Sequence, residues 1–173
     1  MKFGLLGAKL GHSLSPQIHQ EVFRRLGMEA SYELIEVPAE KLAETVADLQ
    51  KTYRGLNVTI PHKVAVMDSL DHIAAEAKAI GAVNTVLFKD GVASGFNTDY
   101  FGFARLLEHN ELVPKGKDVC VLGTGGASRA ILQCVKDMQA RSITVISRAV
   151  ENAPEDIRAH YMVKTYEDLQ MLS

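Results

Sequence analysis

The segment DVCVLGTGGASRAILQC, residues 118–134, is the clearest indication of fold class in this chain. DVCVLG has the pattern of a buried strand, ASRAILQC continues with helical spacing, and a glycine-rich turn lies between them. SITVIS at 142–147 supplies a second apolar strand. A strand, a turn, a helix and another strand form a unit of parallel α/β structure. The pattern predicts the first half of a Rossmann-type dinucleotide-binding domain.

The glycines of this turn suit a pyrophosphate. Gly123 permits a tight turn, Gly125 lets the backbone approach the ligand, and Ser128 is small where helix and strand must pack closely. The helix amino terminus offers unpaired N–H groups and the positive end of the helix dipole. A tight turn without a ligand is the alternative.

The second strand of this unit ends at Ser147-Arg148. A domain selective for NAD usually carries an acidic residue here, which binds the ribose 2′-hydroxyl. Arg148 instead offers a guanidinium, which suits a 2′-phosphate. An incidental surface arginine is the alternative, but these residues favour NADP.

Upstream, short apolar strands alternate with helices, which is typical of parallel α/β structure. Strands are expected at 2–7, 31–37 and 54–60, a hairpin at 82–96, and helices at 15–27, 38–53, 71–80 and 100–108. The polar connector NELVPKGK, residues 110–117, marks a domain boundary. We therefore predict two domains, residues 1–110 and 111–173.

Polar residues gather where the strands of the first domain end. The four clusters are Ser13 and Ser15 in GHSLSP, Asn57, Thr59 and Lys63 in LNVTIPHK, Asn84 and Thr85 in AVNT, and Asn97, Thr98 and Asp99 in GFNTDYFG. Ligands of open α/β sheets bind outside the carboxyl ends of the strands, so the clusters are expected to form one cleft. Hydroxyls, amides, a lysine and an aspartate suit a small polyhydroxy acid.

Each cluster also has a simpler explanation. Ser15, Thr98 or Asp99 could serve only as a helix cap, and Asn84 could satisfy a turn. Lys63 alone could be a solvated charge. The joint pattern favours a site.

Composition limits the function classes. The 173 residues are 47% hydrophobic and 23% charged, which is ordinary for a soluble globular protein, and the net charge of −2 gives no reason to expect nucleic acid or membrane as a partner. Cys120 and Cys134 lie in apolar patterns, which predicts buried thiols and a cytoplasmic location. The six histidines have no metal-ligand spacing, so no metal site is expected.

Five motifs occur in order between residues 4 and 130: GHSLSPQIH, NVTIPHK, GAVNT, GFNTDYFG and GTGGASRA. With these motifs the chain resembles the shikimate dehydrogenase family. The resemblance implies an α/β fold, with an N-terminal substrate domain built on a mainly parallel sheet and then the first half of a Rossmann-type domain. It also implies reversible NADPH-dependent reduction of 3-dehydroshikimate to shikimate, a step of aromatic amino-acid biosynthesis.

The resemblance further implies residue roles. Lys63 and Asp99 would form the catalytic pair, and Asp99 would fix the position of Lys63. The substrate-binding residues would be Ser13, Ser15, Thr59, Lys63, Asn84 and Asp99, with the two serines on the carboxylate. The NADP-binding residues would be Gly123, Thr124, Gly125, Gly126, Ala127, Ser147 and Arg148.

The chain departs from the family in two respects. The second basic residue that often follows the arginine is not evident in VENAPE, residues 150–155. The chain is also shorter than the family's members, so the rest of the nucleotide domain is missing. A half-built parallel sheet has an exposed edge, which predicts self-association or marginal stability.

Three other readings remain open at this point. The first is a quinate/shikimate dehydrogenase with relaxed substrate and cofactor choice. The second is a non-catalytic fragment that binds shikimate-like ligands. The third, methylenetetrahydrofolate dehydrogenase, shares the two-domain plan, but the HSLSP and NVTIPHK motifs argue against it.

Overall fold

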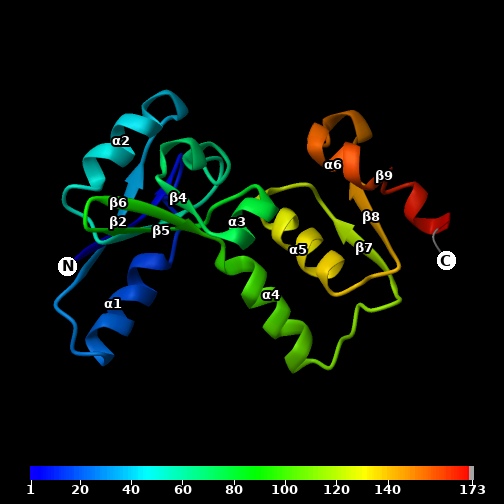
Figure 1. Cartoon of the computed structure of the whole chain (residues 1–173), viewed down its shortest axis with the longest axis horizontal. Helices are drawn as coiled ribbons and strands as arrows, with labels where there is room; N and C mark the ends of the chain where they lie inside the picture. The colour runs from blue at the N-terminus through cyan, green and yellow to red at the C-terminus, as the bar shows by residue number, and fades with distance from the viewer. Residues whose placement is uncertain (172–173) are drawn as a thin grey trace. The chain divides into compact units, whose positions relative to one another are not determined.

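The computed structural model describes residues 1–171 and contains two compact units, Met1–Thr98 and Asp99–Ser173 (Figure 1). The helix α4 (Thr98–His109) joins the two and is grouped almost entirely with the second unit. The predicted boundary after residue 110 would instead leave this helix in the first domain, and that division stays a prediction.

The first unit is built on a six-stranded, mainly parallel sheet, which confirms the predicted fold class. Its strands are β1 (Lys2–Gly7), β2 (Ser31–Glu36), β3 (Gly55–Val58), β4 (His72–Ile73), β5 (Thr85–Lys89) and β6 (Val92–Phe96). The order across the sheet is β2-β1-β3-β5-β6-β4. β1 pairs in parallel with β2 and β3, and β4 with β6, whereas β5 runs antiparallel to β3 and β6.

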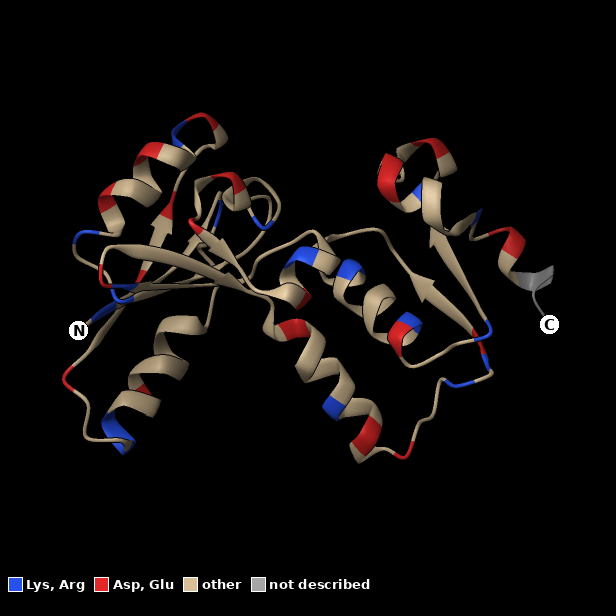
Figure 2. Cartoon of the chain, in the orientation of Figure 1, with Lys and Arg blue, Asp and Glu red and all other residues tan. Residues whose placement is uncertain are grey.

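Three α-helices and two 3-10 turns connect these strands. They are α1 (Ser15–Arg25), η1 (Ala39–Lys41), α2 (Leu42–Leu49), η2 (Ala65–Ser69) and α3 (Ala75–Ile80). Helix α1 begins with a proline in its first turn and ends with Arg24 and Arg25, whose charges complement the helix dipole (Figure 2).

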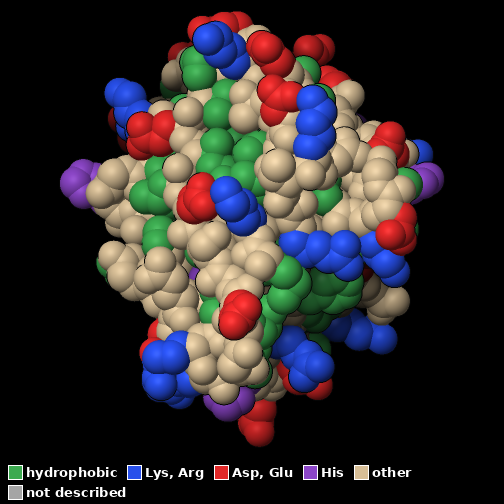
Figure 3. Space-filling model, turned by 90° about the vertical axis from the view of Figure 1, so that its left-hand side faces the viewer, with side chains coloured by type: hydrophobic (Ala, Val, Ile, Leu, Met, Phe, Trp, Pro, Cys, Tyr) green, Lys and Arg blue, Asp and Glu red, His purple; other side chains and the backbone are tan. Residues whose placement is uncertain are grey.

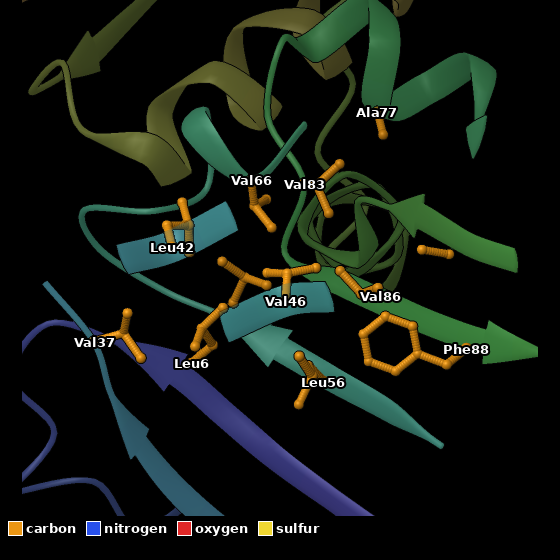
Figure 4. Close-up of a cluster of buried hydrophobic side chains, with 12 residues drawn as sticks. Leu6, Val37, Leu42, Val46, Leu56, Val66, Ala77, Val83, Val86 and Phe88 are labelled. Atoms are coloured by element: carbon orange, nitrogen blue, oxygen red, sulfur yellow. The ribbon is translucent and has the colours of Figure 1, made fainter. Parts of the chain in front are cut away.

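Both faces of the sheet carry hydrophobic clusters. The larger cluster packs α2 and η2 against one face and includes Leu6, Val46 and Val66, all essentially inaccessible (Figure 4). The smaller cluster contains Leu5 and Phe23 and lies beneath α1. Successive side chains of a strand point to opposite faces, so neighbouring residues of β1 enter different clusters.

The prediction of a helix over 71–80 was wrong at its start. Residues His72–Ile73 form the edge strand β4, and α3 begins only at Ala75. The Asp71 carboxylate accepts a hydrogen bond from the Ala93 N–H at 2.7 Å, and the Asp71 N–H donates to the Ala93 carbonyl at 3.0 Å. These long-range bonds hold the segment against β6 and outweigh the local helix propensity of an alanine-rich stretch.

The second unit contains a three-stranded parallel sheet in the order β7-β8-β9. Its elements after α4 are β7 (Asp118–Leu122), α5 (Gly126–Asp137), β8 (Ser142–Ser147), η3 (Val150–Asn152), α6 (Glu155–His160), β9 (Met162–Thr165) and η4 (Asp168–Met171). Val121, Leu132, Val145 and Ile157 form its core. The strand–turn–helix–strand unit expected at 118–147 is confirmed.

Four cations line one cavity at the amino-terminal end of the first sheet, Lys2, Lys51, Arg54 and Lys89, together with Asp90. Figure 3 shows Lys and Arg side chains beside exposed hydrophobic and acidic ones on this side of the molecule. Within residues 1–171, no helix is long and apolar enough to cross a bilayer. No group of three or more His, Cys, Asp and Glu side chains in this same range could hold a metal ion.

Candidate functional site

Strand register brings the four polar clusters to one end of the first sheet, where β1 and β3 finish. In the parallel pair β1–β3, Leu6 lies opposite Val58, and in the antiparallel pair β3–β5, Asn57 lies opposite Thr85. Thr85 in turn faces Phe96, the last residue of β6. One end of the sheet, across its strands, therefore holds the carboxyl ends of β1, β3 and β6 and the start of β5. All four clusters begin there.

The first cluster lies in the loop between β1 and α1. The Ser13 N–H donates to the Leu10 carbonyl at 2.8 Å, and the Ser15 N–H donates to Ser13 Oγ at 3.2 Å. The two serine hydroxyls lie 3.1 Å apart and are hydrogen-bonded. Ser15 is the first helical residue and Leu14 takes the N-cap position, so the alternative in which Ser15 serves only as the cap of α1 was wrong. The Ser15 hydroxyl instead belongs to the serine pair.

The second cluster is a turn that follows β3. The Thr59 N–H donates to the Leu6 carbonyl at 2.9 Å, which extends the pairing with β1 by one residue. Farther along, the Lys63 carbonyl accepts a hydrogen bond from the Val83 N–H at 2.7 Å. Both side chains are half-buried. The turn is thus fixed through its backbone at both ends.

Buried contacts hold this turn from below. The His62 side chain is almost fully buried, with Nε2 2.7 Å from the Val37 carbonyl oxygen, so this ring anchors the turn. A Cβ at Gly7 would lie only 2.7 Å from the Thr59 methyl carbon. Glycine at the end of β1 therefore leaves the space that Thr59 occupies.

The third and fourth clusters are clamped together by Asn84. Its buried amide oxygen accepts hydrogen bonds from the Thr98 N–H and the Thr85 hydroxyl, both at 2.9 Å. Its amide nitrogen donates to Thr98 Oγ1 at 3.0 Å. Because Thr98 begins α4, Asn84 caps that helix from another part of the chain. Asp99 follows in the first turn of α4, where the helix dipole favours a carboxylate.

A hydrogen-bonded chain that the sequence did not predict connects these clusters. The Tyr32 hydroxyl donates to Asn57 Oδ1 at 2.7 Å, and Asn57 Nδ2 approaches Thr85 Oγ1 at 3.5 Å. Thr85 is in turn hydrogen-bonded to Asn84. The chain therefore runs from Tyr32 to the clamp on α4. Tyr32 was missed because an apolar position in an alternating strand predicts only packing.

Tyr32 gives the fold an alkaline pH dependence. Burial raises the pKa of its hydroxyl to about 12, while the Ser15 hydroxyl acts in the opposite direction. In an unfolded chain a tyrosine ionises near pKa ~10. The folded state therefore keeps the proton longer, so this contribution to stability is present below pH ~10 and lost as the pH rises toward 12.

The Tyr32→Phe variant is expected to lose less stability than the parent chain between pH ~9.5 and ~11.5, by roughly 1–2 kcal/mol. Urea unfolding at a series of pH values measures this difference. Tyr166→Phe, which changes a half-exposed tyrosine, is the matched control and should follow the parent chain. Equal alkaline losses in all three proteins would contradict the prediction.

The glycine-rich turn of the second unit has the geometry of a phosphate cradle. Gly123 has φ +98°, in the left-handed region that favours glycine. Gly125 is extended at φ −74°, and a Cβ built there meets no heavy atom within 4 Å. Gly125 is the N-cap of α5 and provides no side-chain cap, so the first N–H groups of the helix can bind phosphate. The buried Ser128 hydroxyl donates to the Gly125 carbonyl.

A cavity of about 530 Å³ opens at the carboxyl ends of β7, β8 and β9. It is lined by Gly123, Thr124, Gly125, Ile146, Ser147, Arg148, Asn152 and Tyr166. Five predicted cofactor residues are thus together in one cavity, whereas Gly126 and Ala127 begin α5 outside that lining. The Ser147 hydroxyl donates to the Ala149 carbonyl at 2.8 Å and holds the turn that carries Arg148. These residues fit a dinucleotide.

Comparison with known proteins finds relatives that match most of this chain. Residues 5–86 match the family model described as the shikimate dehydrogenase substrate binding domain. A curated shikimate dehydrogenase (NADP(+)) of Clostridium perfringens is 49% identical over 152 residues, which are 87% of this chain and 56% of that protein.

Solved structures are similar over nearly the whole chain. The chorismate mutase/shikimate 5-dehydrogenase fusion protein of Clostridium acetobutylicum is 44% identical with a TM-score of 0.90, covering 99% of this chain and 63% of that one. The shikimate 5-dehydrogenase of Thermus thermophilus, in complex with NADP(H) and shikimate, is 35% identical with a TM-score of 0.84, covering 97% and 64%. The chain thus spans less than two thirds of the length of these relatives. It belongs to the shikimate dehydrogenase family.

Proposed function

We propose that the chain carries the substrate domain and part of the nucleotide domain of an NADP-dependent shikimate dehydrogenase. The reaction is the reversible reduction of 3-dehydroshikimate to shikimate. One observation supports this best: the four polar clusters begin at the same end of the first sheet. They carry Ser13, Thr59, Lys63, Asn84 and Thr98-Asp99.

The substrate carboxylate is assigned to the serine pair. The hydroxyls of Ser13 and Ser15, 3.1 Å apart, can both donate to one carboxylate group. Thr59, Asn84 and Asp99 are assigned to the ring hydroxyls, because amide, hydroxyl and carboxylate groups together provide both donors and acceptors. This division of roles gives the site its preference for a polyhydroxylated ring acid.

Lys63 is the proposed proton donor and acceptor. NADP bound at the glycine-rich turn would supply the hydride chemistry, which reduces the substrate carbonyl carbon in one direction and oxidises it in the other. Lys63 donates a proton to the oxygen on that carbon during reduction and takes it back during oxidation. Asp99 holds the Lys63 ammonium in position and contacts the same ring.

NADP is the proposed cofactor, and the relative from Thermus thermophilus was solved with NADP(H). The turn from Gly123 to Ala127 binds the pyrophosphate, with support from the open space at Gly125. Ser147 and Arg148 follow β8, and the Arg148 guanidinium pairs with the 2′-phosphate.

Absorbance at 340 nm tests the proposal, with the 173-residue chain, shikimate and NADP, and with NAD and quinate in parallel assays. Formation of NADPH is expected. A chain that gave no NADPH and bound neither shikimate nor NADP in calorimetry would contradict the proposal.

A binding-only function is the second candidate, because the chain spans only 56% of the Clostridium perfringens relative. In that case calorimetry would detect saturable shikimate binding while no NADPH formed. A preference for quinate in the same assay would instead favour a quinate/shikimate dehydrogenase.

Self-association is proposed for the second unit. Its sheet ends in the edge strand β7, on which Leu122 is 61% exposed, and unpaired edges invite pairing with another chain. Cys120 on the same strand is also exposed, so the prediction of a buried thiol there was wrong. Light scattering should detect a dimer that Leu122→Lys dissociates, while Leu112→Lys, at a similarly exposed connector residue, leaves it intact. A monomer at all concentrations would contradict this.

The cytoplasmic location stays a prediction from composition.

A further inference from the structure

The cavity at the carboxyl ends of β7, β8 and β9, called the nucleotide cavity below, is lined by an aromatic residue, Tyr166, which has no role in the proposed function. Tyr166 lines the cavity together with the glycine-rich turn and Arg148, yet about half of its surface is exposed. The core of this unit packs Tyr161 and leaves Tyr166 out of its cluster. A large ring beside a polar cavity, outside the hydrophobic core, is available to a ligand.

Strand order places this ring where an adenine base would reach. The three strands are parallel and adjacent, so their carboxyl ends lie in a row. The turn after β7, Arg148 after β8 and Tyr166 after β9 follow one another along this row. Two strand spacings amount to roughly 9.5 Å. A dinucleotide whose pyrophosphate lies at α5 and whose ribose lies at Arg148 therefore extends its base toward β9.

Asp168 holds the Tyr166 turn in a fixed shape. Its carboxylate accepts hydrogen bonds from the Thr165 N–H at 2.9 Å and from the Thr165 hydroxyl at 2.8 Å. The Leu169 N–H donates to the Tyr166 carbonyl at 3.3 Å. The turn is thus hydrogen-bonded on both sides of Tyr166, which reduces the conformational entropy that a stacked ligand would have to remove.

We propose that Tyr166 is a cofactor-binding residue whose ring stacks on the adenine base of the dinucleotide. The inference rests on the proposed dinucleotide function of the second unit. Among the described residues that line the cavity, Arg148 is the only charged one, so a single cation recognises the 2′-phosphate. Base stacking then supplies a large share of the affinity, and it does so equally for NAD and NADP.

Isothermal titration of NADP and NAD into the chain tests the assignment. Tyr166→Ala is expected to weaken the binding of both cofactors by the same factor, about 5- to 30-fold. Tyr166→Phe keeps the ring and should retain the affinity of the parent chain. Arg148→Ala should instead weaken NADP alone. Leu169→Ala, which removes an exposed apolar side chain from the same segment, is the matched control and should change neither affinity.

The outcomes separate this inference from the proposed function. Unchanged affinity in Tyr166→Ala, with the selective loss still present in Arg148→Ala, overturns the stacking role and leaves the dinucleotide site standing. An equal loss in Tyr166→Phe and Tyr166→Ala also overturns it, because the contact would then run through the hydroxyl. Absence of cofactor binding by the parent chain overturns both the inference and the NADP assignment, whereas shikimate binding would still support the substrate domain.

Discussion

The Lys63→Ala variant is expected to lose turnover by about 10²- to 10⁴-fold, the range for removing a group that transfers a proton in the transition state. Shikimate affinity should change little, because the serine pair and Asn84 keep their positions. The fold should also survive. The Lys63 backbone is held by the Val83 N–H, and the buried His62 ring anchors the turn from inside.

The measurement is the 340 nm assay, which separates kcat from KM. It can be made in this chain or in a chimera that continues it with the remaining residues of the Clostridium perfringens relative. A fall in kcat and kcat/KM by the same factor identifies an interaction made only in the transition state.

Lys51→Ala is the control for this variant. Lys51 lies at the opposite end of the sheet, and its exposed ion pair with Asp48 contributes little to stability. The control should keep full activity. Unchanged turnover in Lys63→Ala would exclude Lys63 as the proton donor.

Local sequence chemistry predicted most of what positions the site. The strand preceding Gly123 and the helix following Gly125 are set by residue periodicity and by the backbone freedom of glycine, and both are local properties. Polar residues at 59, 63 and 84 stood out because they interrupt apolar patterns. The parallel register of β1 and β3 then places the segments that follow these two strands at the same end of the sheet.

The features that the sequence missed depend on partners far along the chain. β4 exists because Asp71 bonds to Ala93, 22 residues away, and nothing in the alanine-rich stretch after it predicts that contact. Tyr32 joins the site through Asn57, 25 residues away. Tyr166 lines the cavity at the carboxyl ends of β7, β8 and β9 only because β9 pairs with β8. Such pairings are set by tertiary packing rather than by local propensity.

The Gly125→Val variant is expected to weaken NADP binding by at least about tenfold, which corresponds to ~1.4 kcal/mol. Gly125 has an extended backbone that any residue can adopt, and its Cβ would point into open space, so the fold should tolerate valine. The two methyl groups would instead occupy the space in which the pyrophosphate approaches the backbone. Calorimetry with NADP measures the loss. A melting temperature that falls by only a few degrees, as expected when valine replaces glycine at an N-cap, shows that the fold is retained.

Two other glycines separate loss of the cradle from loss of stability. Gly123→Val places a β-branched residue at φ +98°, so it should lower the melting temperature as well as NADP affinity. Gly102 lies in α4 with open space around its Cβ position, and Gly102→Val should keep the affinity while stabilising the helix slightly. If Gly125→Val bound NADP as tightly as Gly102→Val does, the glycine-rich turn could not be the pyrophosphate site. The Rossmann assignment would then describe the fold of the second unit without its function.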